Sequence, residues 1–290
     1  MTRELEGRVA LIAGAGRGIG RAIALAYAKA GARLVLASRT QSDLDVVAAE
    51  CIVAGAPTAR GTSTDIADWR AVSRLVADTI AGEGQIDALV VSSGVYGPIA
   101  PIAELDVEAW THALQVNLAG PLYFLRAVLP VMHAQGRGKV ILLGGGGATL
   151  PMAGFSSYAA AKAGLVRLAE TAALEVGDAG VQVNVIAPGL VDTKLQDAVI
   201  EAGLAAGAVG ERIRRARETG EGAVGPDIAA ALAVFLASDA SGGLTGKLIA
   251  APHDDWRGWG DRAEALNASD WFTLRRLDPH TVERLPKGLA

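Results

Sequence analysis

The stretch Gly14-Ala15-Gly16-Arg17-Gly18-Ile19-Gly20 decides the fold of this chain. It follows a short apolar run at 9–13 and precedes a segment at 19–30 that is typical of a helix. Glycines let the backbone turn sharply and approach a pyrophosphate, and the helix N-terminus offers free N–H groups. The strand before the turn and the helix after it favour a nucleotide-binding site over a turn that glycines merely close.

Outward from this turn, short apolar strands alternate with helices. Strands are expected at 9–13, 34–37, 58–62, 86–92, 139–143, 181–186 and 247–250. Helices are expected at 19–30, 42–54, 68–81, 106–116 running into 117–134, 157–176 and 227–237. Such alternation indicates parallel strands covered on both faces. The prediction is an α/β fold, with one Rossmann-like, doubly wound domain over residues 1–250.

Two regions interrupt this pattern. Residues 189–225 lack strand signals and contain the charged run 211–218, which fits either a mobile insertion over a pocket or a solvated surface helix. Residues 251–290 form a C-terminal extension that we expect to pack on the domain or on a neighbouring subunit. Trp256 and Trp259 lie there, and a pocket wall, a subunit interface and plain packing are equally open for them.

Composition excludes several classes of protein. The 290 residues are 51% apolar and 20% charged, unlike a disordered chain. The net charge of -4 gives no basic excess for nucleic acid. The single cysteine, Cys51, forms no internal disulfide, and neither a signal peptide nor an apolar run of about 20 residues is present. We expect a cytoplasmic protein with no nucleic-acid or membrane partner. The four histidines show no ligand spacing, so no metal site is predicted.

The end of the second strand indicates which nicotinamide cofactor is bound. A carboxylate there would accept the ribose hydroxyls of NAD(H), but this chain has Ser38-Arg39-Thr40. Arg17 supplies a second guanidinium, a group that binds phosphate in a forked geometry. NADP(H) is therefore favoured and NAD(H) is the alternative, with Arg39 then only a solvated charge. Asp65-Ile66, after the third strand, could accept a hydrogen bond from the adenine.

Tyr158 and Lys162 stand four residues apart at the start of a predicted helix, so they share one face. An ammonium beside a phenol favours the phenolate and is expected to lower the pKa of Tyr158. That makes Tyr158 a candidate proton donor to a carbonyl that is being reduced.

With the glycine turn, this pair makes the chain resemble the short-chain dehydrogenase/reductase family over roughly residues 5–250. Asn117 matches the family asparagine that holds a water in the proton relay to the lysine. The segment Asn184-Val185-Ile186-Ala187-Pro188-Gly189 matches the one that passes the nicotinamide. Thr193 matches a residue that contacts cofactor phosphate or carboxamide, and Lys162 by resemblance binds the nicotinamide ribose.

The resemblance implies a seven-stranded parallel sheet and a carbonyl/alcohol oxidoreductase in which Tyr158 acts as acid/base. It also implies a small-molecule carbonyl or alcohol substrate. A homodimer or homotetramer would assemble through the long helices near 106–134 and 157–176. A dehydratase, epimerase or lyase on the same fold, and a non-catalytic NADP(H)-binding protein, remain as rivals.

Two positions depart from the family pattern. After the fourth strand the family has Asn-Asn-Ala-Gly, whereas Val91-Ser92-Ser93-Gly94 keeps only the glycine. We expect a retained but altered turn beside the cofactor at Ser93 and Gly94. The family's catalytic serine, thirteen residues before the tyrosine, is replaced by Gly145 in a run of four glycines.

The replacement at Gly145 has three competing explanations. Another hydroxyl could substitute, with Thr149, Ser156 and Ser157 in the same loop. Backbone N–H groups of the glycine run could bind the substrate oxygen directly. Or the protein does not catalyse ordinary carbonyl reduction, because losing one such donor costs on the order of 10²–10³ in rate.

Overall fold

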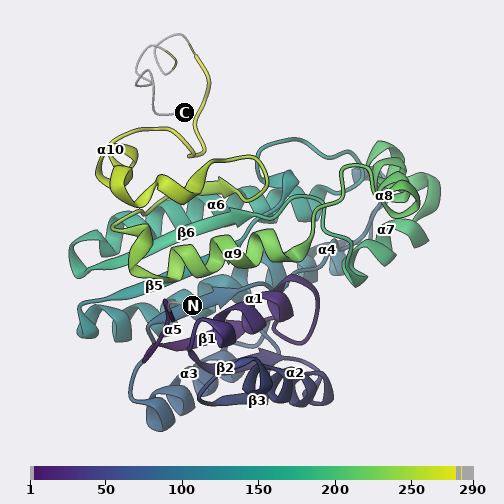
Figure 1. The fold of residues 1–290 in the computed structure, drawn as a ribbon. Coiled ribbons are helices and arrows are strands. Elements are labelled where there is room, and N and C mark those ends of the chain that lie inside the picture. Colours follow the sequence, from purple (N-terminus) through teal and green to yellow (C-terminus); the bar gives the residue numbers. More distant parts are fainter. Residues whose placement is uncertain (1–2, 279–281, 283–290) are drawn as a thin grey trace.

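The glycine turn joins strand β1 (Val9–Ala13) to helix α1 (Gly18–Lys29) in the computed structural model, which describes residues 3–278 and 282 (Figure 1). The other strands are β2 (Arg33–Ser38), β3 (Ala59–Ser63), β4 (Ala88–Val91), β5 (Gly138–Leu143), β6 (Val181–Ala187) and β7 (Leu248–Ala250). The other helices are α2 (Gln41–Ala54), α3 (Trp69–Glu83), α4 (Val107–Leu114), α5 (Gly120–Gln135), α6 (Ser156–Val176), α7 (Asp197–Glu201), α8 (Gly207–Thr219), α9 (Pro226–Ala237) and α10 (Ala263–Asn267).

All seven strands form one parallel sheet, which confirms the predicted doubly wound fold. Their order is β3-β2-β1-β4-β5-β6-β7. The chain first runs outward from β1 to β3 and then returns to place β4 on the other side of β1. The two connections therefore leave β1 and β4 in opposite directions, and a crevice opens beyond their carboxyl ends.

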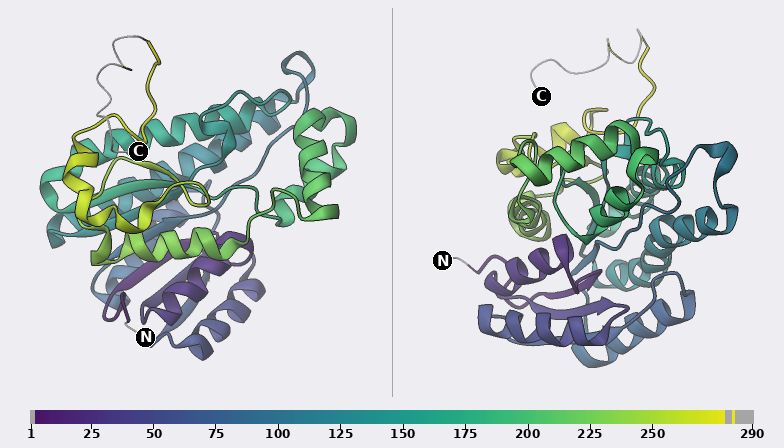
Figure 2. Two further views of the ribbon diagram at one scale, coloured as in Figure 1. Left: turned by 45° about the horizontal axis from the view of Figure 1, so that its top comes forward. Right: turned by 90° about the vertical axis from the view of Figure 1, so that its right-hand side faces the viewer.

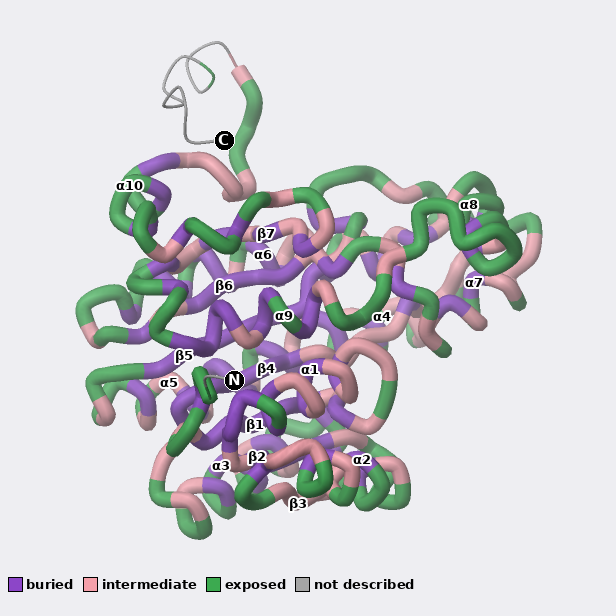
Figure 3. The backbone as a smooth tube through the Cα atoms, in the orientation of Figure 1, coloured by how far each residue is buried: buried purple, intermediate pink, exposed green. Residues whose placement is uncertain are grey.

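Successive strand residues point to opposite faces of the sheet and fill two separate cores. One face carries α1, α2 and α9, with Ile12, Leu36 and Ile141 among its buried residues. The other carries α3, α5 and α6, with Leu11 and Val140 among its own. Outside the edge strand β3, whose residues are half-buried or exposed, the strand interiors are accordingly buried almost throughout (Figure 3). Both faces are apolar, as a parallel sheet covered by helices requires.

One continuous helical stretch, Val107–Gln135, is long and apolar enough to cross a membrane by length and composition alone. It comprises α4, the π-helical turn Gln115–Ala119 and α5. Phe124 and Val128 of α5 are fully buried in the core of the sheet. Part of this apolar stretch therefore packs within the domain.

The insertion at 189–225 contains α7 and α8, and its charged run lies on α8. Buried Val199 and Ile213 join Tyr96, Phe155 and Tyr158 in a third, smaller apolar cluster. The two helices stand at the opposite end of the molecule from α10 (Figures 1 and 2). The charged run thus belongs to a surface helix, α8, whose outer face is exposed. The inner face of α8 packs through Ile213 on the apolar cluster.

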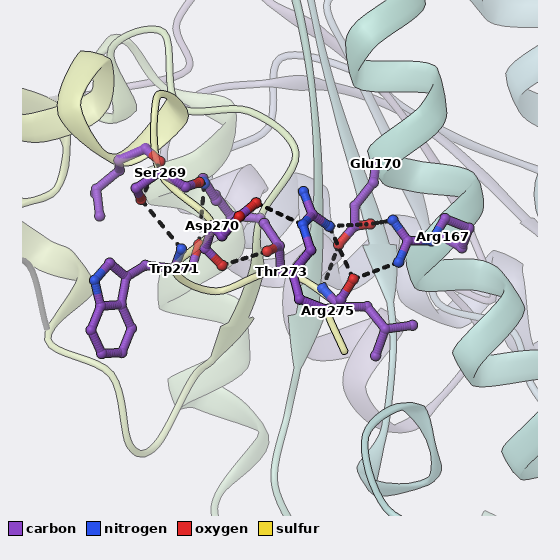
Figure 4. Close-up of polar contacts among 10 residues, drawn as sticks. Arg167, Glu170, Ser269, Asp270, Trp271, Thr273 and Arg275 are labelled. Atoms are coloured by element: carbon purple, nitrogen blue, oxygen red, sulfur yellow. Dashed lines mark hydrogen bonds and ion pairs between the residues drawn. The ribbon is translucent and has the colours of Figure 1, made fainter. Parts of the chain in front are cut away.

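The described part of the C-terminal extension packs on the domain itself. Trp256 and Trp259 are 3% and 4% exposed and belong to the core under α9, so plain packing accounts for them. Farther along, the tail reaches α6, where buried Glu170 binds it (Figure 4). Glu170 accepts hydrogen bonds from the backbone N–H of Leu274 (2.6 Å) and from the guanidinium of Arg275 (3.3 Å).

At both edges of the sheet, backbone groups of the edge strand form hydrogen bonds with other parts of the chain. At β7, the N–H of Leu248 donates to the carbonyl of Phe272 in the tail (2.7 Å). At β3, the side-chain amide of Gln41 accepts from the N–H of Ser63 (2.9 Å) and donates to the carbonyl of Gly61 (3.2 Å). These groups would otherwise be the unpaired groups of edge strands.

We predict that Glu170→Ala lowers the free energy of unfolding by about 2 kcal/mol, because the partly buried N–H of Leu274 and two arginines lose their acceptor. Urea denaturation measures the change. Glu175→Ala is the matched control, since Glu175 is exposed on the same helix. Equal effects of the two substitutions would contradict a stabilising role for the tail contact.

Candidate active site

A cavity of about 710 Å³ lies over the carboxyl ends of the strands. The predicted cofactor-binding residues all line it: Gly14, Gly16, Arg17, Gly18, Ile19, Gly20, Ser38, Arg39, Asp65, Ile66, Ser93, Gly94, Tyr158, Lys162, Pro188, Gly189 and Thr193. These residues come from six separate segments of the chain, which together form one wall of the cavity. A cavity of this size at the strand-order reversal is where an α/β sheet binds its ligand.

The first and last glycines of the turn have no room for a side chain. A Cβ built on Gly14 would lie 2.6 Å from the backbone nitrogen of Ser93, and one on Gly20 would lie 2.1 Å from the carbonyl oxygen of Gly14. Gly14 also has a φ of +81°, which favours glycine. The turn therefore presents bare backbone and the N-terminus of α1 to the cavity, as a pyrophosphate requires.

The far end of the cavity carries the two predicted phosphate-binding cations. Arg17 and Arg39 are exposed at its rim, and no ion pair joins either to a carboxylate in the described chain. Sequence reasoning missed Asp43, which also lines this end and whose Cβ lies close to Gly16. Its place in the first turn of α2 was the available signal. The carboxylate of Asp43 would repel a phosphate bound at this end, whereas Arg17 and Arg39 would attract it.

Tyr158 and Lys162 lie on one face of α6 at the base of the cavity, as their spacing predicts. Both are buried, at 7% and 4% exposure. Lys162 Nζ donates to the carbonyl of Leu143 (2.7 Å) and lies 5.7 Å from the centroid of the Tyr158 ring. The last residue of β5 therefore fixes the ammonium beside the phenol.

The expectation that Lys162 lowers the pKa of Tyr158 is wrong for this geometry. Burial raises the pKa of the Tyr158 phenol, and the neighbouring Tyr96 raises it further. Burial also lowers the pKa of Lys162 to about 8. Desolvation disfavours both charged forms, and it is the largest cause of the shift at each residue. The phenol is accordingly held protonated at neutral pH.

Asn117 lies behind the cavity wall rather than in it. It is fully buried in the π-helical turn between α4 and α5, a feature often found at functional sites. Its amide binds both backbone groups of Val95, accepting from the N–H (3.0 Å) and donating to the carbonyl (2.7 Å). The side chain therefore fixes the loop that follows β4.

Comparisons with known proteins agree with this arrangement. The family model described as short chain dehydrogenase matches residues 8–203. The chain belongs to the short-chain dehydrogenase family. It is 37% identical over 243 residues to D-threitol dehydrogenase of Mycolicibacterium smegmatis, covering 83% of this chain and 90% of that protein. It is 35% identical over 246 residues to cis-4-hydroxycyclohexanecarboxylate dehydrogenase of Sinomonas cyclohexanicum, covering 84% and 94%.

A solved structure from Beutenbergia cavernae is also similar, with a TM-score of 0.76 and 31% identity over 90% of this chain and 100% of that one. That protein is assigned as an NAD(P)-dependent gluconate 5-dehydrogenase, and its structure contains NADP at low occupancy. Membership in this family of oxidoreductases implies use of NAD(P)(H).

This short-chain dehydrogenase has no space for a side chain at the position of the family's serine. A Cβ built on Gly145 would lie 2.1 Å from the hydroxyl oxygen of Tyr158. The backbone of Gly145 is extended (φ 163°, ψ 170°), so the obstacle is the phenol and not backbone strain. The hydroxyl of Tyr158 therefore occupies the space in which the serine side chain would begin.

The three loop hydroxyls that could replace the serine do not line the cavity. Ser157 Oγ donates to the carbonyl of Tyr96 (3.0 Å), Ser156 Oγ accepts from the indole of Trp110 (3.1 Å), and Thr149 is exposed. The structure therefore does not favour any of these three hydroxyls as a substitute for the serine. Gly144, Gly145 and Gly146 do line the cavity, so the backbone explanation stays a prediction.

Sequence reasoning missed Tyr96, the cavity hydroxyl beside Tyr158. The two rings are tilted at 54° with centroids 4.8 Å apart, and Tyr96 donates to Gln196 Oε1 (3.0 Å). Its position two residues after Gly94, in the loop that follows β4, was the available signal. Of the C-terminal extension, His253 lines the cavity, and no group of metal ligands gathers among the described residues.

We predict that Gly145→Ser lowers kcat about 100-fold, because the new side chain displaces the Tyr158 phenol by the order of 1 Å or more. Steady-state kinetics measure the change. Gly177→Ser is the matched control, since a Cβ on Gly177 meets nothing within 4 Å and Gly177 lies outside the cavity lining, and it should stay within about twofold of wild type. A faster Gly145→Ser enzyme would show instead that the phenol yields and the missing hydroxyl limits the rate.

Proposed function

We propose that this short-chain dehydrogenase uses NADP(H) to interconvert a carbonyl and an alcohol, with Tyr158 as the acid/base. The observation that carries the proposal is the junction of the glycine turn with the buried Tyr158–Lys162 pair in one cavity. The relatives' names support the reaction class, because they describe dehydrogenases of a polyol and of a hydroxy acid.

The residues at the cofactor end fit a dinucleotide with an additional phosphate. The side-chain-free turn at Gly14 and Gly20 and the N-terminus of α1 would hold the pyrophosphate. Arg17 and Arg39 would bind the 2′-phosphate. Pro188, Gly189 and Thr193, after β6, would border the nicotinamide end. When bound, the cofactor supplies or removes a hydride at the substrate carbon, and the chain supplies geometry and the proton.

The proton is held at the Tyr158 hydroxyl oxygen. Because burial keeps the phenol protonated, it can donate to the oxygen of a carbonyl that is being reduced. Lys162 would bind the nicotinamide ribose and return a proton to the phenol, and its pKa of about 8 allows exchange near neutral pH. Asn117 would complete the relay by fixing the loop at Val95 and, as the family resemblance implies, by holding a water.

The two alternative functions differ from the proposed one in what they would do to the substrate and the cofactor. A dehydratase, epimerase or lyase would form product with no net change in cofactor redox state, and a non-catalytic binding protein would form none. The intact Tyr158–Lys162 pair and its continuity with the cofactor end favour the oxidoreductase.

We also propose a cytoplasmic homodimer or homotetramer that assembles through the long helices. Apolar side chains stand exposed there, with Leu122 on α5 at 45% and Leu174 on α6 at 87%. Covering them would remove apolar surface from water.

We predict that Tyr158→Phe abolishes turnover, with a loss of at least about 1000-fold, while NADPH affinity changes less than about threefold. The lost hydroxyl is the proton donor, and the ring that remains keeps the packing. NADPH absorbance with a panel of ketones and aldehydes measures turnover, and NADPH fluorescence titration measures binding. Tyr123→Phe, on α5 against Trp69, is the control. Full activity of Tyr158→Phe would remove Tyr158 from the mechanism.

We predict that Arg39→Asp shifts the ratio of kcat/KM for NADP(H) over NAD(H) at least about 10-fold toward NAD(H), because a carboxylate repels the 2′-phosphate and accepts ribose hydroxyls. Steady-state kinetics with both cofactors give the ratio. Arg74→Asp, exposed on α3 and outside the cavity, controls for the change in net charge. An unchanged ratio would mean that Arg39 does not bind the phosphate.

A further inference from the structure

Charge is distributed unevenly along the cavity. The carboxylates among its described lining residues are Asp43 and Asp65, and both lie at the end formed by β2, α2 and β3. The opposite end, around Tyr158, is bordered by Tyr96, Gln196 and Arg212. The substrate end of the cavity therefore presents a guanidinium and no carboxylate from the described chain.

Arg212 differs from Arg215 and Arg217 on α8. Arg217 binds Asp192 and Asp197 (2.7 Å each), and Arg215 binds Glu221 (2.9 Å). These pairs hold the helix and its flanking turns outside the cavity. Arg212 lines the cavity, and none of the ion pairs in the described part of the chain includes it.

Arg212 is an exposed residue of the cavity lining, and its nearest link to the reacting group runs through Tyr96. Ile213, the next residue, packs in the same apolar cluster as Tyr96 and Tyr158. The guanidinium lowers the pKa of Tyr96 against the larger effect of burial, so the two groups lie within electrostatic range. Tyr96 in turn packs on Tyr158 with ring centroids 4.8 Å apart. An unpaired cation thus stands near the group that handles the substrate's proton.

The polar groups beside Arg212 are already oriented. Tyr96 donates to Gln196 Oε1 (3.0 Å), and Gln196 Nε2 donates to the carbonyl of Val191 (3.3 Å). Both side chains are buried, at 7% and 6% exposure. Apolar Met152, Val209 and Ile213 line the same region. A ligand that fits here has an apolar body and one anionic group.

We propose that the substrate of this enzyme carries a carboxylate, which Arg212 binds, in addition to the carbonyl or alcohol that reacts at Tyr158. This inference rests on the proposed function and narrows its substrate class to oxo and hydroxy acids. A guanidinium binds a carboxylate through two parallel hydrogen bonds, so it selects the acid over the neutral amide of the same shape.

Paired substrates test the proposal in the full-length enzyme. Lactate, hydroxybutanoate and hydroxycyclohexanecarboxylate would each be compared with its primary amide, using NADP+ and NAD+. We expect kcat/KM for at least one acid to exceed that for its amide by about 10- to 100-fold. Arg212→Gln should remove that preference, and Arg215→Gln, its matched control on the same helix, should keep it. A preference that Arg212→Gln retains, or amides used as well as acids, would overturn the proposal.

A binding measurement separates this proposal from the proposed function. Calorimetric titration of the NADP+-loaded protein with cyclohexanecarboxylate and with cyclohexanecarboxamide requires no turnover. Tighter binding of the carboxylate that is lost in Arg212→Gln supports the anionic subsite even if no alcohol is oxidised. Equal binding of the two compounds by wild type overturns the subsite even if neutral alcohols are oxidised in a Tyr158-dependent way.

Discussion

The contact between the glycine turn and the end of β4 is the constraint on which this molecule depends. Gly14 lies so close to the backbone of Ser93 that no side chain fits between them. This approach joins the two halves of the sheet where their order reverses, and it leaves the N-terminus of α1 facing the crevice. Binding surface and fold therefore share one set of atoms, so a substitution at Gly14 would damage both together.

Most of the fold could be predicted from the sequence because its signals are local. Apolar runs of four to seven residues, the glycines that end them and the helices between them fix the seven strands to within about two residues. The wall of the cavity could be predicted in the same way, since the carboxyl ends of parallel strands meet at one edge. The tail contacts at Glu170 could not be predicted, because they join segments about a hundred residues apart with no repeating pattern.

The chemistry of the site was harder to predict than its location. The spacing of Tyr158 and Lys162 gives their shared face but not their burial, and burial reverses the expected direction of the tyrosine pKa. The structure explains why glycine replaces the family's serine at position 145, because the phenol of Tyr158 occupies the space that a side chain would need. Tyr96 and Arg212 carry no motif, and only the folded loop after β4 and the packed α8 bring them into one cavity with Tyr158.

The hydrogen bond between Leu248 of β7 and Phe272 of the tail bears on how copies of this chain can associate. A sheet with free edges can be lengthened by a strand from another molecule, which leads either to a shared intermolecular sheet or to aggregation. Here the tail takes up the outer side of β7, and Gln41 does the same at β3. At these positions the outer backbone groups of the edge strands already have partners within the chain, so they are not free to pair with a strand of another copy.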